Sequence, residues 1–168
     1  MWRCSAALAV CILTFSACTS ETAVQLQPGD EAGGSDAQVE IASVIETYDR
    51  VVTEMNLDLF RTIVADPGVV SIVSPGGRVG AADLQGFFDG LRNTYSEIDI
   101  VFSNIGIQSE GATGWATFDF AFDGTLADGQ EVAFTGWETQ VYRRTGDGWR
   151  IAHLHYSVPF VTPVAAEQ

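Results

Sequence analysis

The sequence predicts an α+β fold in which N-terminal helices pack on a curved, mostly antiparallel sheet. Two observations lead to this prediction. Apolar residues recur at helical spacing up to about residue 93, and after Tyr95 they alternate with a period of two. Short turn-forming stretches join the later segments, which favours an antiparallel meander. Helices first and a meander afterwards indicate a domain of two layers.

The first 17 residues are typical of a secretory signal peptide. Arg3 precedes an apolar run that is too short for a usual membrane span, and the small residues Ser16 and Ala17 follow it. Cys18 comes directly after them, as in the lipobox of bacterial lipoproteins. We therefore expect an exported protein, periplasmic or at the cell surface, that is anchored to the membrane through a lipidated Cys18. Ordinary cleavage near Ala17 is the alternative.

The rest of the 168-residue chain divides into a flexible tether (18–36), one domain (37–160) and a short tail (161–168). The tether is polar and shows no apolar period, which is typical of linkers. All three cysteines precede the domain. The domain therefore has no thiol for a disulfide, a thiolate metal site or a cysteine nucleophile.

The formal net charge is −14, and every basic side chain other than histidine is an arginine. Such an acidic field argues against nucleic acid or an anionic membrane surface as a partner, so we expect membrane contact only through the lipid anchor. The lack of lysine in the sequence also excludes Schiff-base chemistry and a P-loop.

Three helices are expected before the sheet. Ser35 and Gln38 form a capping box, and apolar residues at helical spacing follow as far as Met55. Asn56 ends this helix and caps a second one over 57–64. "ADPG" is a turn, 69–74 is a strand, and "PGGRVG" is a second turn. The third helix covers 81–93, with its apolar face at Leu84, Phe87, Phe88 and Leu91.

Four further segments alternate with the period of strands. They span 98–107, 113–122, 131–144 and 149–157. The connections "SEGA", "DGTLADGQ" and "TGDG" between them are rich in turn-forming residues.

The C-terminal part of the domain carries a set of short motifs. They are an E-T-x-V strand, an aromatic and basic pair, a D-G-x-W turn and a last strand with H-x-H-x-S-x-x-P. These motifs fall on Glu138, Thr139, Val141, Tyr142, Arg143, Arg144, Asp147, Gly148, Trp149, His153, His155, Ser157 and Pro159. Together with "DPG" at 66–68 they resemble the SnoaL-like group of the nuclear-transport-factor-2-like superfamily. Within it, the chain is most similar to the group related to the association (hub) domain of calcium/calmodulin-dependent protein kinase.

The resemblance implies a SnoaL-like cone over roughly 37–159, and a homodimer, since dimers are usual in this superfamily. It does not select a function, because the same fold serves isomerases, dehydratases, hydrolases, binding domains and oligomerisation domains. In the hub group the pocket is basic. Here Asp119 and Gln140 stand at the matching arginine positions, and Gln85 stands at a histidine position. These departures argue against an anionic ligand.

His153 and His155 are the only histidines, and strand alternation places them on one face together with Trp149, Ile151 and Ser157. Two histidines on one strand face bind zinc or iron if a carboxylate, such as Asp119 or Glu138, lies opposite. The alternative is that H-x-H is a structural feature of the family. We favour the alternative and expect neither a metal nor another cofactor.

Asp119 lies in "WATFDFAFD", on the face of Trp115 and opposite the row Phe118, Phe120 and Phe122. A carboxylate among aromatic residues is a candidate general acid or base, and a couple with His153 or His155 would serve an isomerase or a dehydratase. A partly solvated carboxylate at the rim of the sheet is the alternative. The phenylalanine row either lines the cone or forms a dimer surface.

The expected function is therefore the binding of a small, largely apolar, neutral or cationic molecule inside the cone of a homodimer. Candidate lining residues are Tyr48, Phe60, Gln85, Trp115, Trp137, Glu138, Gln140 and Tyr142. One alternative is a cofactor-independent isomerase or lyase that uses Asp119 with His153 or His155. Another is a structural oligomerisation (hub) domain.

Overall fold

The computed structural model describes residues 32–66 and 71–159. The expected signal peptide (1–17), the lipidated Cys18, most of the tether and the tail (161–168) lie outside the described residues. The same holds for 67–70, which include part of the expected "ADPG" turn and the beginning of the expected strand at 69–74.

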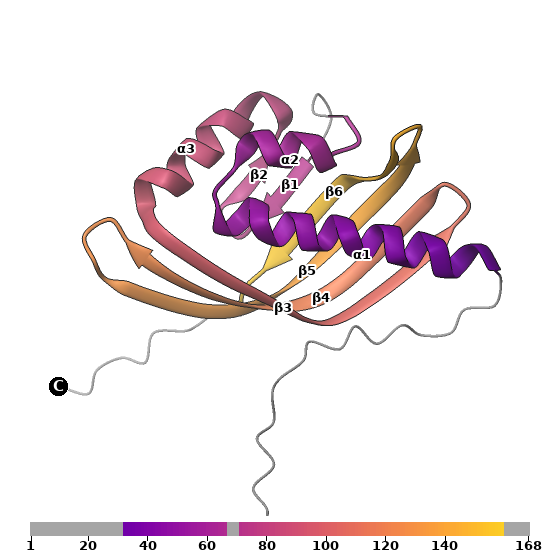
Figure 1. Ribbon diagram of the computed structural model, residues 1–168. Helices are drawn as coiled ribbons and strands as arrows, with labels where there is room; N and C mark the ends of the chain where they lie inside the picture. The colour runs from indigo at the N-terminus through magenta and orange to yellow at the C-terminus, as the bar shows by residue number, and fades with distance from the viewer. Residues whose placement is uncertain (1–31, 67–70, 160–168) are drawn as a thin grey trace, which may run out of the picture.

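The described chain forms three helices, one short 3-10 helix and six strands. In chain order they are α1 (Ala32–Thr53), α2 (Leu57–Ile63), β1 (Ser71–Ser74), β2 (Gly77–Val79), η1 (Ala81–Asp83), α3 (Leu84–Thr94), β3 (Tyr95–Glu110), β4 (Thr113–Leu126), β5 (Glu131–Thr145) and β6 (Gly148–Ser157). The helices lie on the concave face of one curved sheet (Figure 1). The expected α+β architecture is confirmed.

Helix α1 runs along the concave face of the sheet (Figure 1). Its buried residues recur every three or four positions, from Ala37 through Ile41 and Ile45 to Tyr48. This spacing forms one apolar stripe that packs against β3 and β6. The helix begins at Ala32, so the last residues of the expected tether are helical. No helix in the described part of the chain is long and apolar enough to cross a membrane.

Asn56 separates α1 from α2, as the sequence predicts. Its side chain accepts a hydrogen bond from the backbone N–H of Leu59 at 3.0 Å, which caps the first turn of α2. The helix then buries Leu57, Phe60 and Ile63. The cap therefore fixes where the chain turns and aims Phe60 into the core.

The sheet has the strand order β2-β1-β6-β5-β4-β3. Strands β3 to β6 form the predicted antiparallel meander, whereas β1 pairs with β6 in parallel. Strand β2 was not predicted. Gly77 to Val79 follow turn residues and contain only one residue with an apolar side chain, yet they pair with β1 to form a hairpin at the edge of the sheet.

The concave face of the sheet holds the core. Phe118, Phe120 and Phe122 alternate along β4 with exposed or half-exposed residues, and all three are buried. Phe118 packs edge-on against Phe102, with ring centroids 4.8 Å apart. The phenylalanine row therefore lies inside the cone, and the alternative of a dimer surface at these residues is wrong.

Strand β6 departs from regular alternation at Ala152. Tyr142 lies opposite Ile151 and Val141 lies opposite His153, so Ala152 is an extra residue with no partner on β5. Such a β-bulge reverses the facing of every residue beyond it. Trp149, Ile151 and Leu154 are buried on the concave side. His153 and His155 therefore face the convex side, and the expectation that they share a face with Trp149 and Ile151 is wrong.

Candidate functional site

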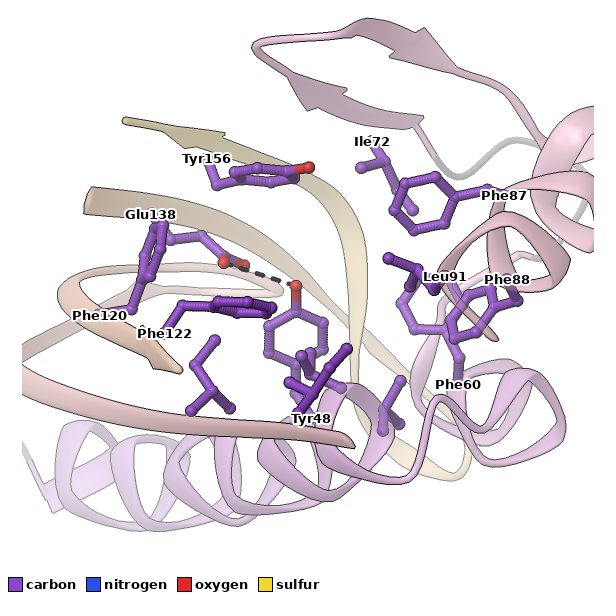
Figure 2. A pocket seen from close by; sticks show the side chains of 14 residues that line it. Tyr48, Phe60, Ile72, Phe87, Phe88, Leu91, Phe120, Phe122, Glu138 and Tyr156 are labelled. Carbon is purple, nitrogen blue, oxygen red and sulfur yellow. Dashed lines mark hydrogen bonds between the residues drawn. The ribbon is translucent and has the colours of Figure 1, made fainter. Parts of the chain in front are cut away.

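A cavity of about 90 Å³ lies between the helices and the curved sheet (Figure 2). Every helix contributes to its wall, and so do five of the strands. The lining consists of Tyr48, Val51 and Val52 from α1, Phe60 from α2, Phe87, Phe88 and Leu91 from α3, and Ile72, Ile98, Ile100, Phe120, Phe122, Glu138 and Tyr156 from the sheet. Seven of these side chains carry aromatic rings, and Glu138 is the only acidic residue among the described residues of the lining.

Glu138 projects from β5 into this cavity and is only 4% exposed. Its Oε1 accepts a hydrogen bond from Nε2 of Gln140 at 2.6 Å. Its Oε2 accepts a longer one, 3.5 Å, from the hydroxyl of Tyr48 on α1 (Figure 2). Both carboxyl oxygens are therefore held by neutral donors.

The amide of Gln140 is itself held in place. The hydroxyl of Tyr142 donates a hydrogen bond to Oε1 of Gln140, so the amide oxygen faces Tyr142 and the amide nitrogen faces Glu138. Both Gln140 and Tyr142 are fully buried. The residues at 138, 140 and 142 share one face because they are two apart on a strand. They form a polar chain that ends at the cavity.

The apolar surroundings determine the protonation state of these hydrogen-bonded side chains. Burial raises the pKa of Glu138 to about 8, although the hydrogen bonds from Gln140 and Tyr48 act in the opposite direction. Burial also raises the pKa of Tyr48 well above its ordinary value, and the charge of Glu138 adds to that effect. At neutral pH the carboxyl of Glu138 is therefore mostly protonated.

Glu138 has no basic partner in the described structure. Among the described residues that line the cavity, none is basic. The ion pairs between described arginines and acids are Arg50–Glu54, Arg61–Asp58, Arg92–Asp89 and Arg144–Glu40, and all of them are exposed. The cavity therefore presents a carboxyl group without the counter-charge that buried acids usually have.

The structure places the predicted lining residues in three groups. Tyr48, Phe60 and Glu138 line the cavity, and Gln140 and Tyr142 lie behind Glu138. The other three predicted residues do not reach it.

Gln85 is exposed on α3, where its amide donates to Asp89 at 3.1 Å. Trp115 and Trp137 face the convex side, because each is adjacent to a residue that faces the core. Trp137 is 55% exposed. Since neighbouring residues on a strand face opposite sides, Trp137 and Glu138 cannot both line one cavity.

The three candidate catalytic residues also face the convex side. Asp119 lies between the buried Phe118 and Phe120, and its Oδ2 accepts a hydrogen bond of 2.6 Å from the amide of Asn104. Strand β5 lies between Asp119 on β4 and the histidines on β6, which separates their backbones by roughly 10 Å. The structure does not bring these residues together, and their catalytic role stays a prediction.

Sequence reasoning missed much of the cavity wall. Leu91 was assigned to the apolar face of the third helix, which is the signal that marks it. Tyr156 was placed on the face opposite the histidines, and the unforeseen bulge at Ala152 turns it inward instead. Ile72 reaches the cavity through the parallel pairing of β1 with β6, a long-range contact with no local signal.

The family model described as "SnoaL-like domain" matches residues 41–161. The chain belongs to this SnoaL-like family. The match begins within α1 and includes every later element of the structure, so it covers both the helical wall of the cavity and Glu138.

Solved structures agree with this assignment. A nuclear transport factor 2-like superfamily protein from Salmonella enterica serovar Typhimurium has 27% sequence identity and a TM-score of 0.70, over 80% of this chain and 99% of that one. A hexachlorocyclohexane dehydrochlorinase from Novosphingobium barchaimii has 14% identity and a TM-score of 0.66, over 79% and 93%. At that identity the likeness concerns the fold alone. No curated protein matches the chain significantly.

The cavity of this SnoaL-like domain offers two kinds of chemistry. Its aromatic and aliphatic wall can bury an apolar ligand, and its single carboxyl can orient the polar end of that ligand. The same carboxyl can exchange a proton, because a pKa of about 8 keeps both protonation states accessible near neutral pH.

Proposed function

We propose that this SnoaL-like domain binds a small, largely apolar molecule, neutral or cationic, in the cavity between its helices and its sheet. The observation that carries the proposal is the apolar, largely aromatic wall with one buried carboxyl, Glu138, at its centre. A wall of this kind with few polar groups is typical of small-molecule sites. An anionic ligand is disfavoured by Glu138 and by the net charge of −14.

The size of the cavity limits the ligand. Its volume of about 90 Å³ is below the 150 Å³ or so of an apolar cavity that admits benzene. A ring-sized ligand therefore requires some side chains to move. Val52, Phe87, Leu91 and Tyr156 are only partly buried and line the same cavity, so they have the most room to do so.

Binding is tested by filling the cavity. Leu91→Trp places an indole against the cavity from α3, whereas Asn93→Trp places the same ring at an exposed position two residues along the same helix. Small apolar probes, such as benzyl alcohol and isobutylamine, are titrated while methyl signals are followed by NMR. We expect cavity methyl shifts in the native domain and in Asn93→Trp, and none in Leu91→Trp. Equal shifts in both variants would place the binding elsewhere.

A cofactor-independent isomerase or lyase is the second candidate function. The observation that favours it is the raised pKa of Glu138, which suits a general acid or base. A structural neighbour named as a dehydrochlorinase adds support at the level of the fold. In this case turnover should depend on a group with a pKa near 8 and should be lost in Glu138→Gln. The Asp119–histidine couple would have to act on the convex face.

We also propose that the domain is a homodimer whose contact is the convex face of the sheet. None of the described helices covers this face (Figure 1). It carries the exposed Trp137, together with the hydrogen-bond acceptor Asp119 and the hydrogen-bond donor His155. A second copy related by two-fold symmetry can pair such groups reciprocally. A structural hub domain would use the same face and leave the cavity without a ligand.

Export remains part of the proposal. The signal-like segment 1–17 and Cys18 support a lipoprotein at the periplasmic or outer surface of a bacterial cell. The test is mass spectrometry of the protein purified from membranes. An N-terminal diacylated Cys18 supports the anchor, and a free N-terminus near residue 18 in the soluble fraction indicates ordinary cleavage.

A further inference from the structure

Glu138 is a buried acid whose partners are all neutral. Tyr48 on α1, Gln140 on β5 and Tyr156 on β6 are the polar groups near it, and Tyr142 lies one step behind Gln140. The rest of the cavity wall, from α2, α3, β1, β3 and β4, is apolar in the described structure. The described chain therefore supplies no positive charge to balance a carboxylate at this position.

The hydrogen bonds around Glu138 nevertheless favour its ionised form. Oε1 and Oε2 each accept a hydrogen bond, from Gln140 and Tyr48 respectively. A protonated carboxyl has to turn one oxygen into a donor, whereas a carboxylate uses both as acceptors. Burial acts the other way, since it penalises the charge. A positive charge inside the cavity would act in the same direction as these hydrogen bonds and favour the carboxylate.

The aromatic wall of the cavity can also stabilise a positive charge. Seven of the fourteen lining side chains carry rings, and ring faces attract cations whose centres lie within about 6 Å of the ring centroid. The acidic surface of the protein raises the local concentration of cations and lowers that of anions. The aromatic wall, the carboxyl of Glu138 and the net charge of the protein therefore all favour a positively charged ligand.

We propose that the cavity binds a small organic ammonium ion and that Glu138 releases its proton to solvent when the cation enters. This inference rests on the proposed binding function and narrows its ligand class. The balance is simple: a protonated carboxyl and an ammonium ion in solution become a carboxylate–ammonium pair in the cavity and one free proton. The amine keeps all of its protons.

The first experiment compares ligands of matched shape. Isobutylamine and isobutanol, and benzylamine and benzyl alcohol, are titrated by calorimetry into the purified protein at pH 7. We expect each amine to bind at least tenfold more tightly than its alcohol. Equal affinities would overturn the cation inference and leave the binding function standing. If neither amines nor alcohols bind, both proposals fail for ligands of this size.

The second experiment counts protons. The binding enthalpy of tetramethylammonium, which has no proton to lose, is measured in buffers of different ionisation enthalpy. At pH 7 we expect release of most of one proton per site, because a carboxyl with a pKa near 8 is mostly protonated there. At pH 9 the release should fall to a small part of one proton. A value near zero at both pH values would overturn the proton exchange.

Two variants separate the carboxyl from general charge effects. Glu138→Gln keeps the shape: its amide oxygen can accept from Gln140 and its amide NH2 can donate to the hydroxyl oxygen of Tyr48. The variant should therefore fold, bind the alcohols as before and lose both the amine preference and the proton release. Glu110→Gln makes the same change at the exposed last residue of β3, and should leave all of these values unchanged. If Glu138→Gln retains the amine preference, the cation does not meet Glu138 and the inference is wrong.

Discussion

At the scale of single residues, Glu138 combines two opposing influences. The amide of Gln140 and the hydroxyl of Tyr48 stabilise its charge, and burial among aromatic rings destabilises it more. The folded state therefore holds a proton that the unfolded chain gives up near pH 4.5. At any pH at which this carboxyl is ionised in the unfolded state and protonated in the native state, it lowers the free energy of unfolding.

We predict that Glu138→Gln removes part of the pH dependence of stability. Between about pH 4.5 and pH 8 the native state binds one more proton at Glu138 than the unfolded state does, so native stability falls as the pH rises through this window. The expected slope from this group is roughly 1 kcal/mol for each pH unit. Urea unfolding of both proteins from pH 5 to pH 9 measures the difference. Parallel curves would show that the carboxyl is already ionised in the native state.

Tyr142 offers a second prediction at this scale. Tyr142→Phe leaves Oε1 of Gln140 buried without a donor, which should cost about 1–3 kcal/mol in the free energy of unfolding. The amide of Gln140 also loses the contact that orients it toward Glu138, so the pKa of Glu138 should rise further. NMR titration of the Glu138 carboxyl carbon measures that shift. An unchanged pKa would mean that the amide is held by other contacts.

At the scale of elements, β5 owes its position to a glycine. A Cβ at Gly136 would lie 2.5 Å from Cζ of Phe120 and even closer to the carbonyl oxygen of Ser157. The lack of a side chain thus lets the Phe120 ring lie across β5 next to Glu138, where it forms part of the cavity wall. By contrast, Gly146 in the β5–β6 turn has open space around its would-be Cβ.

We predict that Gly136→Ala destabilises the domain by about 1–3 kcal/mol, because Phe120 or the end of β6 must shift. Gly146→Ala makes the same substitution in open space and should change stability by less than about 0.5 kcal/mol. Thermal unfolding of both variants measures the contrast. Equal effects would show that the close packing at Gly136 is easily relieved.

Most of the helices and strands could be predicted from the sequence. The helices and the meander were predictable because their signals are local: the helical period of α1, the Asn56 cap and the two-residue alternation of β3 to β6. The hairpin of β1 and β2 was only half foreseen, since Gly77 to Val79 have turn chemistry and become a strand through pairing alone.

The candidate site was predicted less completely, for a reason that lies in β6. Strand alternation correctly groups Glu138, Gln140 and Tyr142, since nothing interrupts the pairing of β4 with β5 around them. The bulge at Ala152 depends on how β6 meets β5 and has no signature in the surrounding residues. His153 and His155 were therefore assigned to the face of Trp149 and Ile151, while Tyr156 was assigned to the opposite face.

At the scale of the whole molecule, the curved sheet separates a concave surface from a convex one. The concave side is closed by helices and holds the cavity (Figure 1). The convex side carries Trp137, which is 55% exposed, on a strand whose opposite face holds Glu138. One strand therefore presents its cavity residue and its outer aromatic residue at adjacent positions, and the two surfaces can be altered independently.

We predict that Trp137→Arg converts a dimer into a monomer without affecting ligand binding in the cavity. A charged side chain at the centre of a sheet-to-sheet contact lacks a partner and is costly to bury. Val39→Arg, on the exposed side of α1, introduces the same charge in place of another exposed apolar residue and should leave the dimer intact. Light scattering after size exclusion gives the masses. A monomeric native domain would end the dimer proposal.

The extra residue on β6 has a consequence for how such sites diversify. Beyond Ala152 the strand carries two interleaved sets of side chains, Leu154 and Tyr156 on one side and His153 and His155 on the other. The position of one unpaired residue selects which set faces the cavity. Sliding that residue past Tyr156 would exchange a phenol for an imidazole beside Glu138 without a single substitution. Strand β6 thus carries a second set of side chains that a change of register alone would bring to the concave face.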